Sequence, residues 1–464
     1  MVLPTLSLRS GVLSAVVLLS LYSKSKQQNS YMKKTLLFIA TLLASYVGMA
    51  QETYHPTAEN LKAREQFQDE KFGIFLHWGL YSMMGTTEWI MTNRDINYKE
   101  YPKLAKTFYP SEFDADAWVK AIQAAGAKYI TITTRHHDGF SLFKTATSTY
   151  NSVDGTPFKR DIIKEMADAC QRNGIKLHLY YSHLDWGRED YPAGRTGTGT
   201  GRPKEKANWA SYYKFMNTQL TELLTNYGKV GAIWFDGWWD HDSDAKPFDW
   251  QLEEQYALIH KLQPQCLIAN NHHHTPFPGE DIQIFERDLP GENKAGLSGQ
   301  SIGRLPLESC QTINEHWGYN ITDTLYKSPK ELIQMLVRAA GKNANLLLNI
   351  GPEPGGALPE LALNRLQAIG KWLNQYGETI YGTRGGIIAP HEWGVSTQRG
   401  NKLYIHILNC MDSSLFIPTG NHKIKSATVF GTNKRVNFTK TGNGITLNFD
   451  TVPTDIDYIV ELTL

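Results

Sequence analysis

The chain has 464 residues, of which 41% are hydrophobic and 20% are charged, an ordinary globular composition with enough apolar residues for more than one core. The formal net charge of +1 does not favour nucleic acid or an anionic membrane surface as a partner. Twelve tryptophans and 23 tyrosines fit a large core. They are also typical of sugar sites, where aromatic rings pack on the C–H faces of a sugar.

The N-terminal segment has the pattern of a secretory signal peptide. Two lysines follow Met32, and the apolar stretch after them ends in Gly48-Met49-Ala50, a small-x-small cleavage site. We therefore interpret residues 1–50 as an upstream extension and a signal peptide, with translation starting at Met32 and cleavage after Ala50. The alternative is an uncleaved anchor. Cleavage predicts an exported chain, periplasmic or extracellular, with no stable membrane insertion.

From residue 51 onward, short apolar segments of strand length alternate with segments of helical period. The eight apolar segments are 72–79, 128–140, 175–186, 230–239, 266–273, 281–288, 307–311 and 345–352. Near-continuous apolar strands separated by helices are typical of a parallel sheet, and eight of them predict a (β/α)₈-like barrel. The fifth to seventh units are poorly helical, so we expect irregularity there. A doubly wound sheet is the alternative, which the lack of a GxGxxG helix start disfavours.

The hydrophobic period changes to two near residue 385, after a last helical segment over residues 359–377. Short alternating strands separated by polar turns predict a small antiparallel β-sandwich. We therefore expect a catalytic domain over residues 51–384 and a C-terminal β-sandwich domain over residues 385–464.

Polar side chains gather at the carboxyl ends of the predicted strands, where barrels of this kind place their active sites. In AIWFDGWWD, residues 232–240, an apolar strand ends in Asp236 and tryptophans follow. Histidines follow the first, second and fifth strands. Each residue also has a structural interpretation, since Asp236 could cap a helix and the indoles could be core. Their gathering at one end of the barrel favours a site.

Two kinds of site fit this set. In the first, His77, His136 and His137 bind zinc together with a carboxylate. Adjacent histidines on a strand point to opposite faces, so one ion cannot hold both without a bend, and no HExxH spacing is present. In the second, a pair of carboxylates acts on a hydroxyl-rich sugar, as glycoside hydrolysis requires.

Several segments in order resemble the retaining α-L-fucosidases of glycoside hydrolase family 29, from about residue 55 to the C-terminus. They are FGIFLHWGLYS, RHHDGFSLF, a Tyr-Tyr-Ser after the third strand, WFDGWW and NLLLNIGP. The resemblance implies a (β/α)₈-like domain followed by a β-sandwich, and the release of terminal α-L-fucose from oligosaccharides with retention. It implies no metal and no other cofactor.

The resemblance also implies roles for individual residues. Asp236 matches the family's nucleophile. The positions that match its fucose-binding residues are His77, Glu88, Trp89, His136, His137 and Tyr180. Trp317, in HWGYN, is expected to line the site. Some members have Asn-Asp-Arg after the fifth strand, where this chain has Asn270-Asn271-His272. We expect His272 or Arg287 to replace the missing arginine.

The proton donor of the family lies on a loop of variable length, and three glutamates compete for the role. We expect Glu292, because its place before the LPLESC segment fits the spacing best, with Glu286 second and Glu308 third. Two other functions stay open: a non-catalytic fucose-binding protein on the same scaffold, and a metal-dependent hydrolase that uses the histidines.

Overall fold

The computed structural model describes residues 54–432 and 434–464. The predicted extension and signal peptide, residues 1–50, lie outside them. The chain divides into two units, Met1–Tyr54 and His55–Leu464, and the second contains every helix and strand of the described residues. No helix in this described part is both long and apolar enough to cross a membrane.

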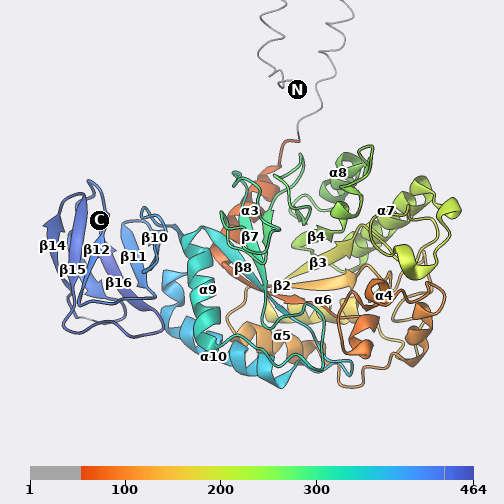
Figure 1. The fold of residues 1–464 in the computed structure, drawn as a ribbon, viewed down its shortest axis with the longest axis horizontal. Helices are drawn as coiled ribbons and strands as arrows, with labels where there is room; N and C mark the ends of the chain where they lie inside the picture. Colours follow the sequence, from red (N-terminus) through yellow and green to blue (C-terminus); the bar gives the residue numbers. More distant parts are fainter. Residues whose placement is uncertain (1–53, 433) are drawn as a thin grey trace, which may run out of the picture. The chain divides into compact units, whose positions relative to one another are not determined.

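Eight parallel strands form one sheet (Figure 1). They are β1 (Phe72–Leu76), β2 (Tyr129–Arg135), β3 (Lys176–Ser182), β4 (Ala232–Asp236), β5 (Leu267–Asn270), β6 (Gln283–Glu286), β7 (Leu307–Thr312) and β8 (Ala344–Ile350). Their order is β5-β4-β3-β2-β1-β8-β7-β6. A bridge between Ala269 and Ile282 joins the two end strands. The sheet is therefore a nearly closed barrel, and the predicted (β/α)₈-like fold is confirmed.

Helices connect most of these strands. The α-helices are α3 (Ala58–Glu70), α4 (Ile90–Asn93), α5 (Ala115–Ala124), α6 (Ile162–Asn173), α7 (Trp209–Asn226), α8 (Leu252–Leu262), α9 (Pro329–Gly341) and α10 (Glu360–Tyr376). The 3₁₀ helices are η1 (Leu80–Met84), η2 (Tyr101–Thr107), η3 (Thr198–Thr200), η4 (Lys204–Lys206), η5 (Trp238–His241) and η6 (Gly377–Thr379). The connections at residues 271–282 and 287–306, all of them described, contain no helix. The predicted irregularity lies in these two connections.

The helix starts follow from local sequence. Asp114, Asp161 and Asn208 accept hydrogen bonds from the free backbone N–H groups of the first turns of α5, α6 and α7, the usual role of an N-cap. In α9, Ser328 and Glu331 form a reciprocal capping box. These caps fix where each helix begins after its strand.

Successive side chains along each strand point to opposite faces of the sheet, one toward the barrel interior and one toward the helices. In β4, Trp234 belongs to the apolar cluster that includes Phe75 and Tyr180 of neighbouring strands. Ile233 and Phe235 belong to the larger cluster that also contains the helices. Asp236, two residues after Trp234, therefore shares the inner face of the barrel. The burial of both faces explains why the strands are continuous apolar segments.

The C-terminal part is built from two antiparallel sheets. One has the order β13-β16-β11-β10-β9 and the other β12-β15-β14. Their strands are β9 (Arg384–Gly385), β10 (Gly394–Arg399), β11 (Lys402–Ile407), β12 (Ser414–Ile417), β13 (Ser426–Val429), β14 (Asn437–Thr441), β15 (Gly444–Asn448) and β16 (Tyr458–Thr463). Both sheets contribute to one apolar cluster, so the predicted β-sandwich is confirmed. The domain boundary at residue 384 stays a prediction.

Candidate active site

A cavity of about 180 Å³ lies at the carboxyl ends of the barrel strands. Its lining residues are Phe75, His77, Glu88, Trp89, His136, His137, Arg195, Trp234, Asp236, Trp239, Asn271, His273, Glu286, Leu297, Cys310 and Trp317. His77, His136, His137 and Asp236, all singled out from the sequence, therefore meet in one place. This is the end of a parallel barrel where active sites form.

Asp236 is the last residue of β4, and its carboxylate is held from both sides. Its Oδ1 accepts hydrogen bonds from the backbone N–H of Gly237 (2.8 Å) and from Nε1 of Trp239 (3.0 Å). Its Oδ2 accepts from the hydroxyl of Tyr180 (3.0 Å). Burial and the neighbouring carboxylate of Glu286 raise the pKa of Asp236 to about 6. The carboxylate is therefore rigidly oriented.

The turn after Asp236 requires glycine. Gly237 has φ +93°, and a Cβ there would lie 3.0 Å from the side chain of Leu184. A left-handed conformation in so close a space is accessible only to glycine at low cost. The reversal sends the following indoles in different directions: Trp239 lines the cavity, whereas Trp238 packs on His274 and Phe277.

Glu286 is the last residue of β6 and faces Asp236 across the cavity. Its Oε2 accepts hydrogen bonds from Nδ2 of Asn271 (2.8 Å) and from Nε2 of His273 (2.9 Å). The same Asn271 nitrogen lies 3.5 Å from Oδ1 of Asp236. One amide thus touches both carboxylates, which places them close to each other, as retaining glycosidases require of their carboxylate pair. Burial is the largest single influence on the pKa of Glu286 and raises it, but hydrogen bonds from His273 and Asn271 and the charges of His273 and Arg287 together outweigh burial, so the pKa lies below its usual value.

Glu292, the glutamate favoured from the sequence, lies outside this cavity. Its carboxylate pairs with Lys294 (2.9 Å) and Lys342 (3.2 Å), and it borders a separate hollow together with Arg338. The loop after β6 carries Glu292 past the barrel mouth to the end of α9, where Lys342 holds it. Spacing along the chain gives no information on that path. The choice of the proton donor among the three glutamates therefore stays a prediction.

Glu308, the third candidate, is buried inside the barrel. It accepts hydrogen bonds from the hydroxyl of Tyr129 (2.6 Å) and from Nε1 of Trp234 (2.9 Å). It lies behind the cavity wall that Trp234 forms. Of the three glutamates, the structure therefore brings Glu286 to Asp236.

His77, His136 and His137, the three histidines that match the family's fucose-binding positions, all line the cavity. Strand β2 has a register shift between Thr133 and Arg135, and this irregularity redirects the chain just before His136 and His137. Their ring centroids lie 4.1 Å apart. The bend allows two adjacent histidines to reach the same cavity, although neighbours on a regular strand would point to opposite faces.

The remaining predicted binding residues surround these histidines. Glu88 accepts a hydrogen bond from the backbone N–H of Gly318 (3.0 Å), and the ring of Trp317 lies against His77 with centroids 5.3 Å apart. Trp89 stacks on Trp239 with centroids 5.5 Å apart. These contacts form an aromatic wall with polar groups between the rings, which is the composition that suits a sugar.

The two residues proposed to replace the family's arginine do not line the cavity. His272 is buried and lies 3.0 Å from Oε1 of Glu280. Arg287 lies over the ring of Trp317. His273 takes the place at the site, with a positive φ of +65°. The run of three consecutive histidines in the sequence indicates that a histidine lies at the site. Only the backbone reversal at His273 decides which of the three faces inward.

Asn271 and the loop residues Arg195 and Leu297 also line the cavity, although the sequence did not single them out. They belong to connections without regular structure, where no periodicity indicates which side chain points inward. Among the described residues, no group of three or more His, Cys, Asp or Glu side chains is arranged to hold a metal ion.

A barrel mouth with two facing carboxylates among tryptophans and histidines defines the class of glycoside hydrolases. A family model for α-L-fucosidases matches residues 41–378. The plasma α-L-fucosidase of Rattus norvegicus is 30% identical over 80% of this chain and 83% of its own length. The chain belongs to the α-L-fucosidase family, and its activity is that of a retaining α-L-fucosidase.

Solved structures agree with this membership. α-L-Fucosidase isoenzyme 1 from Paenibacillus thiaminolyticus superposes with a TM-score of 0.78 at 35% identity, covering 88% of this chain and all of the other. A family 29 α-L-fucosidase from Bacteroides thetaiotaomicron, trapped as a covalent intermediate with 2-fluoro-fucosyl fluoride, has a TM-score of 0.75 at 27% identity. Its match covers 89% of this chain and 98% of its own.

Proposed function

We propose that this cavity hydrolyses terminal α-L-fucosides of oligosaccharides by double displacement, with Asp236 as nucleophile and Glu286 as acid/base. The observation that carries the assignment is the pair of carboxylates at the ends of β4 and β6, joined through Asn271. Glu292 is tied to two lysines elsewhere.

In the first step, ionised Asp236 attacks the anomeric carbon and forms a β-fucosyl-enzyme, while Glu286 protonates the leaving oxygen. In the second step, Glu286 removes a proton from water, which attacks the same carbon from the opposite face and restores the α configuration. Tyr180 and Trp239 hold the Asp236 carboxylate in place for this attack. The first step requires the proton to lie on Glu286 in the sugar complex, whereas in the ligand-free site the pKa of Glu286 is lowered and that of Asp236 is raised.

His77, Glu88, Trp89, His136, His137 and Trp317 then form the fucose-binding wall. A cavity that pairs particular hydroxyls rejects sugars that leave its buried polar groups unpaired. A non-catalytic binding protein needs this wall but no second carboxylate. Glu286, largely buried beside Asp236, therefore favours catalysis over binding alone.

The assignment of the two carboxylates is tested with Asp236→Gly, Glu286→Ala and the matched variant Glu292→Ala. Asp236→Gly should lower turnover of an aryl α-L-fucoside by roughly 10³-fold or more. Glu286→Ala should strongly slow fucosides with poor leaving groups, and Glu292→Ala should remain close to wild type. Circular dichroism checks that each variant is folded.

Azide separates the two roles by the configuration of the product. With Glu286→Ala, azide replaces water in the second step and should give α-fucosyl azide. With Asp236→Gly, azide replaces the nucleophile and should give β-fucosyl azide. Azide rescue of Glu292→Ala with loss of rescue in Glu286→Ala would reverse the assignment of the acid/base.

A further inference from the structure

What each cavity histidine offers a ligand depends on which ring nitrogen carries its proton. A neutral imidazole donates a hydrogen bond from one nitrogen and accepts at the other. Burial lowers the pKa of His77 and of His137 well below the ordinary histidine value. The neutral ring is therefore the form that meets a ligand, and its tautomer decides the recognition.

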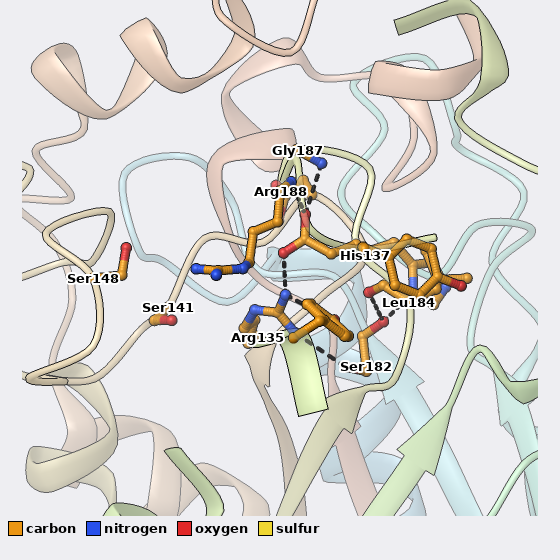
Figure 2. Close-up of polar contacts among 12 residues, drawn as sticks. Arg135, His137, Ser141, Ser148, Ser182, Leu184, Gly187 and Arg188 are labelled. Atoms are coloured by element: carbon orange, nitrogen blue, oxygen red, sulfur yellow. Dashed lines mark hydrogen bonds and ion pairs between the residues drawn. The ribbon is translucent and has the colours of Figure 1, made fainter. Parts of the chain in front are cut away.

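A serine behind the cavity settles the tautomer of His137. The hydroxyl oxygen of Ser182 lies 2.6 Å from the carbonyl oxygen of Leu184 and 2.7 Å from Nδ1 of His137 (Figure 2). A carbonyl oxygen can only accept, so it takes the single hydroxyl proton of Ser182. The serine oxygen must then accept from His137, which places the ring proton on Nδ1 and a lone pair on Nε2.

The backbone that presents the Leu184 carbonyl is itself fixed. Asp185 accepts hydrogen bonds from the backbone N–H groups of Gly187 (2.7 Å) and Arg188 (2.9 Å). It also pairs with the buried Arg135, which in turn donates to the carbonyl of Ser182 (Figure 2). The turn after β3 therefore cannot easily rotate its carbonyl away from Ser182.

The proton position matters because Nε2 of His137 lies 3.5 Å from Oδ2 of Asp236. A proton on Nε2 would form a hydrogen bond to that carboxylate and weaken it as a nucleophile. A lone pair on Nε2 adds no further hydrogen bond to the carboxylate beyond the one that Oδ2 accepts from Tyr180. It also makes this nitrogen an acceptor for a hydroxyl group.

A second chain of hydrogen bonds, through Asn349, fixes the tautomer of His77 in the same way. Nδ2 of Asn349, on β8, donates to the backbone carbonyl of Trp317 (2.7 Å), so its Oδ1 faces Nδ1 of His77 at 2.6 Å. An amide oxygen only accepts, hence His77 also carries its proton on Nδ1. Its Nε2 is the nitrogen left for a ligand.

We propose that Ser182 and Asn349 are positioning residues that hold His137 and His77 as Nδ1–H tautomers, so that both Nε2 atoms accept hydrogen bonds from sugar hydroxyls. Groups that orient a functional histidine from behind commonly fix its tautomer in this manner. The inference rests on the proposed function for the identity of the ligand. Fucosides with fluorine in place of the hydroxyls that meet these nitrogens should bind poorly, because fluorine cannot donate.

The tautomers can be measured directly by ¹⁵N NMR of the ligand-free protein labelled at histidine, with His77→Gln and His137→Gln used to assign the signals. Nδ1 should give the protonated signal in both residues. In Ser182→Ala, the proton of His137 should move to Nε2, toward Asp236, while His77 is unchanged. The matched control is Ser141→Ala, which removes a buried hydroxyl whose hydrogen bond comes from Gln219.

The value of kcat/KM should change in the same Ser182 variants in which the tautomer of His137 changes. Ser182→Ala should lower kcat/KM by about tenfold, the effect of one hydrogen bond, whereas Ser182→Thr, which keeps a hydroxyl, should restore both the wild-type tautomer and the rate. A wild-type His137 protonated on Nε2, or an unchanged His137 tautomer in Ser182→Ala, would overturn the proposal. Because the spectra need no turnover, failure of the catalytic assignment would show separately, in the azide products.

Discussion

At the scale of single residues, Asp236 combines two properties that oppose each other in an exposed carboxylate. It is largely buried, which disfavours its charge, and it accepts four hydrogen bonds, which orient that charge. The result is a carboxylate with a raised pKa but a single orientation. A nucleophile needs the orientation, and the raised pKa determines the pH at which it becomes active.

The pH dependence of kcat/KM should therefore have an acidic limb near pH 6, the pKa of Asp236. Lowering the pH through this value protonates the nucleophile, so the rate falls. Glu286→Gln removes a neighbouring negative charge, so this limb should move to lower pH. The profile is best measured with an aryl fucoside whose leaving group needs no protonation. A limb that stays in place in Glu286→Gln would argue against electrostatic coupling of the two carboxylates.

Residues at the ends of regular strands were predictable from the sequence, and loop residues were not. Asp236 ends β4 and His77 directly follows β1. The apolar pattern of both strands is clear, so the place of these residues at the barrel mouth follows from the fold. His273 depends on one positive φ angle, and Glu292 depends on the path of a loop without helix. Neither feature leaves a periodic pattern, which is why His272 and Glu292 were the residues chosen from the sequence.

At the scale of elements, strands β2, β4 and β7 are joined inside the barrel by a buried carboxyl group. Glu308 on β7 is 1% exposed and accepts from Tyr129 of β2 and Trp234 of β4. Burial raises its pKa to about 7, although both hydrogen bonds act to lower it. The fold therefore favours the protonated form of Glu308, whose carboxyl group supports the cavity wall through Trp234.

This raised pKa makes stability depend on pH in a defined direction. The folded protein binds the Glu308 proton more tightly than the unfolded chain, so this stabilisation is complete below about pH 4.5 and is lost as the pH rises through 7. Glu308→Gln cannot titrate. Its free energy of unfolding relative to wild type should therefore rise between pH 5 and 8, by an amount of order 3 kcal/mol. Urea unfolding of wild type and Glu308→Gln at both pH values measures this change. A difference in unfolding free energy between the two proteins that does not depend on pH would contradict the raised pKa of Glu308.

At the scale of the whole described molecule, helix α9 links the barrel to the sandwich. Val395 of β10 belongs to the same apolar cluster as Leu336 and Val337 of α9. Nε2 of Gln334 donates to the carbonyl of Leu408 (3.1 Å). The sequence predicted both parts from their different periods. It could not predict this contact, because the residues that form it are ordinary core residues in each part.

Because of this contact between α9 and β10, the barrel and the sandwich should unfold as one cooperative unit. Val395→Asp places a charge at a position that is 1% exposed, and it should lower the free energy of unfolding by about 3 kcal/mol or more. The same substitution at Val452, which is 38% exposed, should change it by about 0.5 kcal/mol or less. Calorimetry of both variants is the measurement. A Val395→Asp protein in which the barrel keeps its wild-type melting temperature would show two independent units.

In the proposed mechanism Asp236 forms the covalent bond to the sugar. The most direct measurement is to trap the intermediate with 2-deoxy-2-fluoro-fucosyl fluoride, digest the protein, and locate the added mass by tandem mass spectrometry. We expect the label in the segment 232–240, on Asp236. A label on Glu286, on Glu292 or on any other residue would contradict the assignment of the nucleophile.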